Sequence, residues 1–397
     1  MSYKLIVSKR LLSTSIGRLN TSSSTSSNVI LGKISEFDSS KFNFNIIAND
    51  PPSINDINAD PIQLALNSSP INTWTKDQIK QIYDTPLYDL IHFSQLQHRK
   101  HHNPGEVQLC TLLNIKEGGC TEDCKYCSQS SKNPTGLKAS KLLQVDQVME
   151  KARQAAANGS TRFCMGAAWR DMAGRKSNLK RIGEMISTIN NELGMETCVT
   201  LGMINADQAK ILKDAGLTAY NHNIDTSREY YPNIISTRKF DERLQTIQNV
   251  QDADIKVCTG GILGMGETSE DHISFLYTLS NMPKHPESLP INKLVSIKGT
   301  PLHDELLEIP KDSERHLKFE QVLKTIATAR IIMPKSIIRL AAGRYTMKEY
   351  EQFICFLAGC NAIFTGERML TTMCNGWDED IQMLKNWGLV PMKSFSK

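Results

Sequence analysis

A regular alternation of short apolar stretches and amphipathic segments runs through the chain from about residue 109 to its end. The short stretches are candidate strands, and the segments between them carry apolar residues at helical spacing. Strands that alternate with helices favour a parallel sheet, and eight such strands can close into a barrel. We therefore predict an α/β fold, a (β/α)8 barrel of the TIM type, with a doubly wound open sheet as the alternative. The eight candidate strands are residues 109–115, 162–168, 196–203, 219–225, 255–263, 291–297, 336–342 and 361–367.

The first 35 residues differ in composition from the rest of the chain. They contain several lysines and arginines and many serines, and the first acidic residue is Glu36. In a helical arrangement the apolar residues of this segment gather on one face and the cations on the other. This composition is typical of a mitochondrial transit peptide, which predicts a protein of the mitochondrial matrix. A basic tail without regular structure is the alternative.

Residues 36–73 are rich in Asn, Ser, Asp and Pro, and such a composition buries too little apolar surface to fold, so we interpret them as a linker. Thr75 and Gln78 form a capping-box pattern before apolar residues at helical spacing, which predicts a helix that begins there. We expect the folded part to span residues 74–397. It would contain this N-terminal helix, the barrel, and a C-terminal helix over "DEDIQMLKNWG".

Charge and hydropathy exclude two broad classes of partner. The net charge is only +4, and no apolar run has the length of roughly 20 residues that a membrane span requires. We therefore expect neither a nucleic-acid partner nor a membrane. The chain contains ten cysteines and no secretion signal, so metal binding or catalysis is a better explanation for them than a disulfide framework.

Three cysteines lie close together directly after the first candidate strand, at Cys120, Cys124 and Cys127. Structural zinc sites take four ligands, and iron–sulfur cubanes are normally held by four cysteines. A triplet without a fourth cysteine nearby leaves one position of a metal centre open for a substrate or cofactor. The alternatives are a zinc site that a distant Cys or His completes, and a cluster of cysteines without a function.

Three further cysteines lie near the middle of candidate strands, at Cys164, Cys198 and Cys258, and Arg339 has a comparable place on the seventh strand. Alternate side chains of a barrel strand point inward. If all three cysteines point inward, their thiols meet inside the barrel. A single buried cysteine is usually only a small apolar side chain, but the matching positions favour a second ligand set. The remaining cysteines are expected to be structural: Cys110, Cys355, Cys360 and Cys374.

The spacing of the triplet, with Tyr126 just before its last cysteine, resembles the signature of the radical S-adenosylmethionine (SAM) enzymes. The resemblance implies a [4Fe–4S] cluster held by Cys120, Cys124 and Cys127, with SAM on the fourth iron. It also implies reductive cleavage of SAM to a 5′-deoxyadenosyl radical, a chemistry that requires no protein acid or base. No catalytic side chain is therefore expected.

Within that superfamily, residues from about 75 to 390 resemble the biotin synthase family. The stretches that carry the resemblance are "GGCTEDCKYCSQSS", "TRFCMGAAWR", "ETCVTLGM", "YNHNIDT", "CTGGILGMGET", "INKLVSIKGTPL" and "IIRLAAGR". It implies a [2Fe–2S] cluster on Cys164, Cys198, Cys258 and Arg339, which would be the sulfur source. Two hydrogen abstractions would then turn dethiobiotin into biotin, the last step of biotin biosynthesis. The implied partners are a ferredoxin- or flavodoxin-type electron donor, the iron–sulfur assembly machinery and a second copy of the chain.

The fourth candidate strand offers polar residues at alternate positions, Asn221, Asn223 and Asp225, which we expect to face one side. The glycine-rich stretch "GGILGMGET" follows the fifth strand, and the resemblance implies that its backbone approaches the adenosyl group of SAM. The resemblance assigns SAM binding to Tyr126, Asn223, Asp225, Gly260, Gly261 and Ile262, and substrate binding to Asn221, Asn223 and Asn292.

Three alternative functions are disfavoured by the sequence. A lipoyl synthase would need a second cysteine triplet near the N-terminus, where only Cys110 precedes the signature. A carbon-skeleton mutase has no need of three strand cysteines. A zinc-binding scaffold or nucleic-acid module would show paired Cys/His motifs and a basic, aromatic face.

Overall fold

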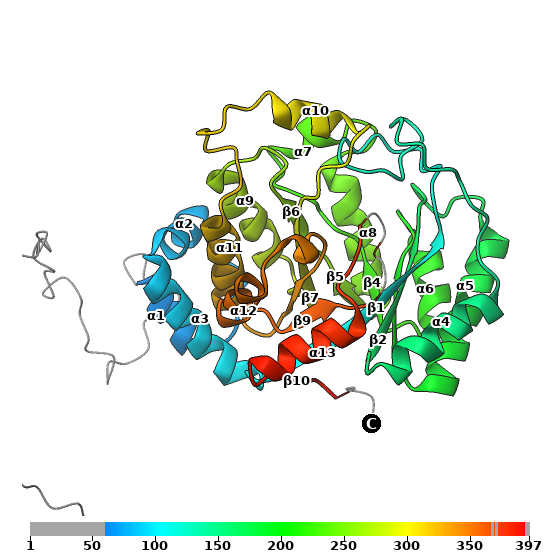
Figure 1. Ribbon diagram of the computed structural model, residues 1–397, viewed down its shortest axis with the longest axis horizontal. Coiled ribbons are helices and arrows are strands. Elements are labelled where there is room, and N and C mark those ends of the chain that lie inside the picture. Colours follow the sequence, from blue (N-terminus) through cyan, green and yellow to red (C-terminus); the bar gives the residue numbers. More distant parts are fainter. Residues whose placement is uncertain (1–59, 367–368, 370–371, 394–397) are drawn as a thin grey trace, which may run out of the picture. The chain divides into compact units, whose positions relative to one another are not determined.

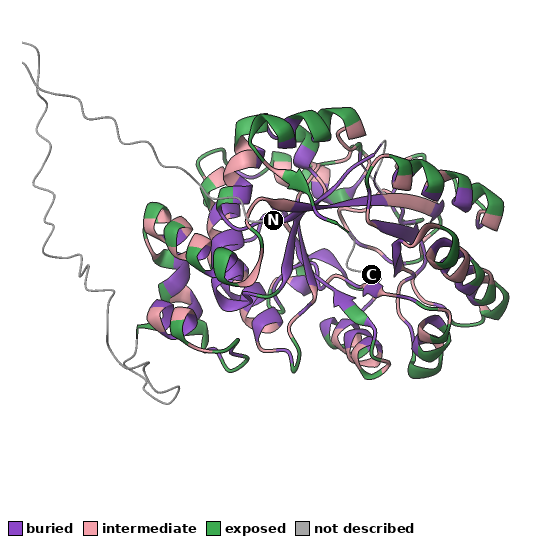
Figure 2. Ribbon diagram, turned by 90° about the horizontal axis from the view of Figure 1, so that it is seen from below, coloured by how far each residue is buried: buried purple, intermediate pink, exposed green. Residues whose placement is uncertain are grey.

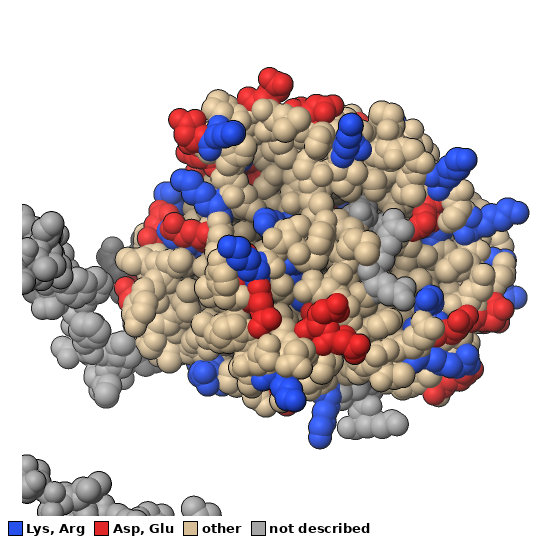
Figure 3. Space-filling view, viewed as in Figure 1, with Lys and Arg blue, Asp and Glu red and all other residues tan. Residues whose placement is uncertain are grey.

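The computed structural model describes residues 60–366, 369 and 372–393 (Figure 1). The expected transit peptide, residues 1–35, and residues 36–59 of the expected linker therefore lie outside the described residues. None of the described helices has the length and apolar character needed to cross a bilayer. On the face shown in Figure 3, basic and acidic side chains are interspersed.

A closed parallel barrel forms the centre of the described part of the chain. Neighbouring strands pair in sequence order from β1 to β5 and then through β7, β8 and β9, and β1 pairs with β9 to close the ring. The short β10 pairs with the start of β1. The strands are β1 (Glu106–Lys116), β2 (Arg162–Ala167), β3 (Glu196–Thr200), β4 (Ala219–Asn221), β5 (Lys256–Cys258), β6 (Gly261–Leu263), β7 (Ser288–Lys293), β8 (Ile337–Leu340), β9 (Ala362–Phe364) and β10 (Val390–Pro391).

The predicted (β/α)8 barrel is confirmed, and the β1–β9 pairing excludes the open sheet. Each of the eight candidate stretches overlaps a strand, although β7 begins three residues earlier than predicted, and the fifth stretch contains two strands, β5 and β6. The break between them falls where the N–H of Gly260 donates to the Asn223 side chain, at 3.1 Å, instead of to a neighbouring strand. The side-chain amide of Asn223 thus replaces a strand-to-strand hydrogen bond at Gly260 and separates β5 from β6.

Helices surround the barrel, with their buried faces turned inward and their exposed faces outward (Figure 2). In the N-terminal part, α1–α3 pack beside α9 and α11 on the outside of the barrel. The helices are α1 (Pro61–Asn67), α2 (Lys76–Asp84), α3 (Leu87–His101), α4 (Val145–Ala157), α5 (Lys176–Leu193), α6 (Ala206–Asp214), α7 (Tyr231–Ile234), α8 (Phe240–Asp252), α9 (Ser269–Ser280), α10 (Pro301–Leu307), α11 (Phe319–Ile332), α12 (Glu349–Leu357) and α13 (Trp377–Asn386), with a 3₁₀ turn at Arg344–Thr346.

Part of the segment interpreted as a linker is folded, because residues 61–67 form α1. Asp60 caps this helix by accepting a hydrogen bond from the N–H of Ile62 at 2.9 Å, and Ile62 and Leu64 are buried. The polar composition of the surrounding segment concealed these few apolar residues. The capping box of Thr75 and Gln78 is confirmed as the start of α2.

A buried ion pair fastens the C-terminal helix to the barrel. Both terminal nitrogens of Arg344, in the turn after β8, donate to the carboxylate of Asp380 on α13, at 2.7 and 2.6 Å. The same guanidinium also donates to Gln352 and to the carbonyl of Phe364 at the end of β9. Burial raises the pKa of Asp380, while the adjacent guanidinium counteracts this effect.

We expect Arg344→Met to lower the free energy of unfolding by about 3–5 kcal/mol, because it leaves the buried Asp380 carboxylate without its cation. Urea unfolding of the purified chain measures this change. The matched control is Arg153→Met, which removes an exposed pair with Glu192 and should cost less than about 1 kcal/mol. Equal losses in the two variants would contradict the structural role of the Arg344–Asp380 pair.

Candidate functional site

A cavity of about 250 Å³ opens at the carboxyl ends of the barrel strands. In barrels of this kind the loops at that end build the active site. The cavity brings the cysteine triplet together with residues that follow most of the strands. Its lining includes Cys120, Cys124, Tyr126, Cys127, Trp169, Thr200, Asn221, His222, Asn223, Asp225, Arg243, Ile262, Asn292 and Ala342.

The loop after β1 is folded back on itself around the triplet. The N–H of Cys120 donates to the carbonyl of Gln129 at 3.0 Å, and the N–H of Ser131 donates to the carbonyl of Cys120 at 2.8 Å. The side-chain amide of Asn133 donates to the carbonyls of Cys124 and Cys127. These bonds occupy the backbone polar groups of the loop, so that all three thiols can turn to the cavity that they line.

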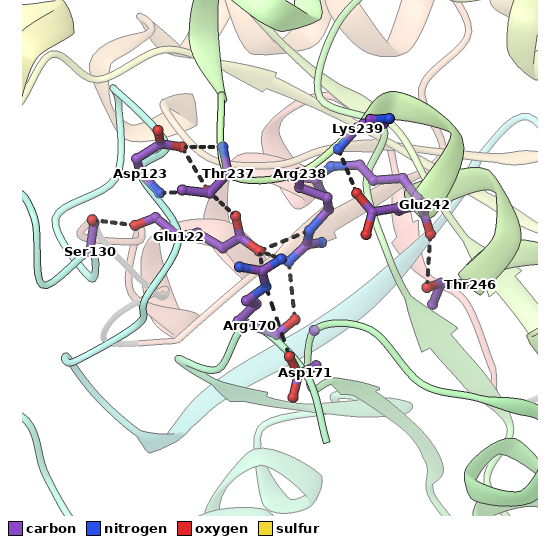
Figure 4. Close-up of polar contacts among 12 residues, drawn as sticks. Glu122, Asp123, Ser130, Arg170, Asp171, Thr237, Arg238, Lys239, Glu242 and Thr246 are labelled. Carbon is purple, nitrogen blue, oxygen red and sulfur yellow. Dashed lines mark hydrogen bonds and ion pairs between the residues drawn. The ribbon is translucent and has the colours of Figure 1, made fainter. Parts of the chain in front are cut away.

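Charged residues inside the triplet anchor the loop to the segment between α7 and α8 (Figure 4). Arg238 donates from Nε and Nη2 to Glu122 Oε1 at 2.9 and 2.6 Å, and both side chains are buried. Asp123 accepts hydrogen bonds from the backbone of Ser236 and Thr237. Partial burial raises the pKa of Asp123, but the bonds from Ser236 and Thr237 outweigh it and hold the pKa well below its usual range.

The thiols of the triplet fit a cluster better than a single ion. Within the described residues, no three His, Cys, Asp or Glu side chains are close enough together to hold one metal ion. A cluster needs no such convergence, because each thiolate binds a different iron atom. Burial raises the pKa of Cys127 to about 11, so metal binding there must displace the thiol proton.

The strand cysteines meet inside the barrel, as predicted from their matching positions. Cys164 on β2 lies directly opposite Cys198 on β3, and both pack with Cys258 of β5 in one buried cluster. A fourth cysteine, Cys110 on β1, belongs to the same cluster. The prediction that Cys110 is merely structural therefore has to be reconsidered.

Arg339 of β8 reaches this group of thiols and is completely buried. Its Nη2 donates to Gln108 Oε1 at 2.7 Å and to Cys110 Sγ at 3.1 Å, and its Nη1 donates to Ser288 Oγ at 3.0 Å. Nη1 also lies 3.8 Å from Cys258 Sγ. The Nε donor has no hydrogen-bond partner among the described residues. A guanidinium with a spare donor, next to several thiols, fits a site for an anionic group such as an iron–sulfur cluster.

The polar residues after β4 all line the cavity, but not for the predicted reason. The strand ends at Asn221, and Asp225 has a left-handed backbone with φ of 69°, so strand alternation does not set their directions. Asn221 Nδ2 donates to Cys258 Sγ at 3.2 Å. Asp225 accepts from Tyr126 at 3.0 Å and pairs with Arg243 at 2.6 Å. Burial raises the pKa of Asp225, although Arg243 counteracts it.

The glycines after β5 have a packing role in the structure. A Cβ on Gly260 would lie 2.0 Å from the Pro290 carbonyl oxygen, and one on Gly261 would lie 2.6 Å from the Asp225 carbonyl oxygen. Of the three residues in this stretch that were expected to contact SAM, Ile262 lines the cavity. Asn292 also lines it, and its amide donates to the Gly261 carbonyl and accepts from the Ala342 N–H.

Sequence reasoning missed several residues of the site, among them Arg238 and Arg243 in the cavity lining and Cys110 beside the strand cysteines. Arg238 lies just before α8, and Arg243 lies within it. A cation in or beside an ordinary helical segment gives no sign in the sequence of the buried carboxylate with which it pairs. Cys110 could have been found, because it lies inside the first candidate strand just as the other strand cysteines lie in theirs.

Comparison with known protein families identifies two matching regions. Residues 116–279 match the Radical SAM superfamily, and residues 290–390 match the Biotin and Thiamin Synthesis associated domain. The first region contains both cysteine sets except Cys110, and the second contains Asn292 and Arg339. Together they cover the barrel from the end of β1 to β10.

Among solved structures, methylornithine synthase is similar with a TM-score of 0.69 and 16% identity, covering 84% of this chain and 97% of that one. At that identity the likeness shows the fold alone. This likeness agrees with the closed barrel. The structure of a maturase of the [FeFe]-hydrogenase is similar to this chain with a TM-score of 0.68.

Curated relatives are much closer in sequence. The mitochondrial biotin synthase of Saccharomyces cerevisiae is 67% identical over 84% of this chain and 88% of its own length. That of Arabidopsis thaliana is 53% identical over 84% of this chain and 85% of its own length. These names confirm the prediction of a mitochondrial protein, whereas the transit peptide itself stays a prediction. The chain belongs to the biotin synthase family of radical SAM enzymes.

Proposed function

We propose that this enzyme inserts sulfur into dethiobiotin to form biotin, using SAM-derived radicals and a sulfur atom from a second cluster. One observation carries the proposal: the cavity that the triplet lines is also lined by Asn221, which contacts one of the strand cysteines. Asn221 Nδ2 donates to Cys258 Sγ at 3.2 Å, so the strand cysteines lie directly behind the lining of this cavity. A substrate in the cavity would be within reach of both sets.

The first set would hold a [4Fe–4S] cluster through Cys120, Cys124 and Cys127. When bound, such a cluster supplies the electron that cleaves SAM at its sulfonium. The protein's contribution is to hold the loop in one shape, through Asn133 inside the loop and Arg238 beneath it. Rigid placement of this kind keeps the reacting atoms within reach of each other.

The second set would hold a [2Fe–2S] cluster through Cys164, Cys198, Cys258 and Arg339, which would supply the sulfur atom. Arginine is an unusual ligand because its guanidinium normally stays protonated. Arg339 is held in place by Gln108 and Ser288, so its position does not depend on the cluster. Burial at the barrel centre would keep water and oxygen away from the sulfide.

Residues on β6 and β7 and just after β4 would bind SAM and the substrate. Asp225, oriented by Tyr126 and Arg243, would accept hydrogen bonds from the ribose of SAM, and Ile262 would pack against the adenosyl group. Asn292 would bind the ureido ring, because an amide can donate and accept as a urea does. Its backbone contacts use one donor and one acceptor and leave the others for the ring.

The remaining partners also belong to this proposal. An electron donor of the ferredoxin or flavodoxin type would reduce the first cluster, and the iron–sulfur assembly machinery would build both clusters. The functional unit would be a homodimer of mature chains in the mitochondrial matrix. The family resemblance supports each of these assignments.

Replacing Cys198 by alanine separates the two sites. We expect SAM cleavage to persist and biotin formation to fall below detection, because Cys198 belongs only to the second set. Chromatography of 5′-deoxyadenosine and biotin from one anaerobic reaction measures both. The matched control is Cys360→Ala, which removes a thiol that is equally buried but packs in the main apolar core. Biotin formation at the wild-type level by Cys198→Ala would overturn the sulfur-donor role.

Replacing Arg238 by methionine tests how the cysteine loop is positioned. The change leaves the buried Glu122 carboxylate with only the longer ion-pair contact to Arg170 Nε, at 3.4 Å, so we expect a looser loop and loss of iron from the first site. Iron content and the rate of SAM cleavage should both drop, by about tenfold or more for an outer-shell partner. Arg228→Met, which removes an exposed pair with Asp241 nearby, should leave both unchanged. Wild-type iron content in Arg238→Met would refute the role.

A further inference from the structure

Cys110 is a fourth thiol of the strand-cysteine group. It lies on β1, one strand before Cys164, and is completely buried. It packs with Cys164, Cys198 and Cys258 in one cluster that is separate from the main apolar core. Four of the barrel strands, β1, β2, β3 and β5, thus supply thiols to one place.

The contact with Arg339 distinguishes Cys110 from an ordinary packing cysteine. Its sulfur accepts a hydrogen bond from Arg339 Nη2 at 3.1 Å, a shorter contact than the 3.8 Å between Nη1 and Cys258 Sγ. Cys355 and Cys360 are equally buried, yet they belong to the main apolar core. Cys110 is therefore in direct contact with Arg339, the one proposed ligand of the second cluster that is not a cysteine.

A second observation concerns a buried hydrogen-bond donor of Arg339 that has no acceptor among the residues that the structure describes. The Nε of Arg339 is buried, and it has no hydrogen-bond partner in the described part of the chain. A buried donor without a partner is costly, so the site is built to receive a group that accepts from it. The thiol of Cys110 lies against the same guanidinium and would face the same group.

We propose that Cys110 is a reserve iron ligand of the second site, which takes the fourth position when Arg339 does not occupy it. The inference rests on the proposed function, because it assumes an iron–sulfur cluster at this site. During assembly the bond from iron to Cys110 Sγ would form as the S–H bond breaks and its proton passes to water, and the water that held the fourth position on iron would leave. No electron is transferred in that step.

The test compares four anaerobically reconstituted proteins: wild type, Arg339→Met, Arg339→Met with Cys110→Ser, and Arg339→Met with Cys360→Ser as the matched control. Resonance Raman spectra report the number of thiolates on the second cluster, and release of iron to EDTA reports how firmly it is held. Arg339→Lys replaces Arg339→Met throughout if the methionine variant does not fold, since it keeps a buried cation.

We expect Arg339→Met to show the spectrum of an all-thiolate [2Fe–2S] cluster. Adding Cys110→Ser should abolish that spectrum and speed the loss of iron by about tenfold or more, whereas Cys360→Ser should change neither. The same spectrum and iron release with and without Cys110→Ser would overturn the role of Cys110. Absence of a second cluster from the wild type would instead refute the proposed function.

Discussion

One buried cation, Arg339, organises the centre of this barrel. Its guanidinium is fully removed from water, and it is held by Gln108 and Cys110 of β1 and by Ser288 of β7. A cation in such surroundings is stabilised only by acceptors and anions close by. The thiols that gather around it therefore form an electrostatic unit with the arginine, and not a chance accumulation of small apolar side chains.

The barrel architecture explains how two different groups of thiols come close to one cavity. Cys164, Cys198 and Cys258 lie on strands and meet in a buried cluster beside Asn221, which lines the cavity. The loop after β1 lies at the carboxyl ends, where it brings the triplet to the cavity mouth. This arrangement would suit a reaction that requires two chemically distinct iron sites within reach of one substrate. The strand cysteines lie within the strands, whereas the triplet lies in the loop beyond the end of β1, so the two groups of thiols are kept apart.

Much of this could be predicted from the sequence, because periodic patterns reflect backbone geometry directly. Alternating apolar stretches predicted the strands, and cysteines at matching positions predicted the buried thiol group. Features that depend on tertiary contacts could not be predicted: the pair of Glu122 with Arg238 joins residues far apart in the chain, and the left-handed backbone of Asp225 ends the strand alternation. Helix α1 was missed since composition averages over a segment, whereas packing depends on a few side chains.

The central claim is that one chain holds two kinds of iron–sulfur cluster, one at the cavity mouth and one among the strand cysteines. Mössbauer spectroscopy of the wild-type protein, reconstituted anaerobically with isotopically enriched iron, measures this directly. The account predicts overlapping spectra of a [4Fe–4S] and a [2Fe–2S] cluster in the same sample. A spectrum with only one type of cluster, or a protein that binds zinc in place of iron, would contradict it.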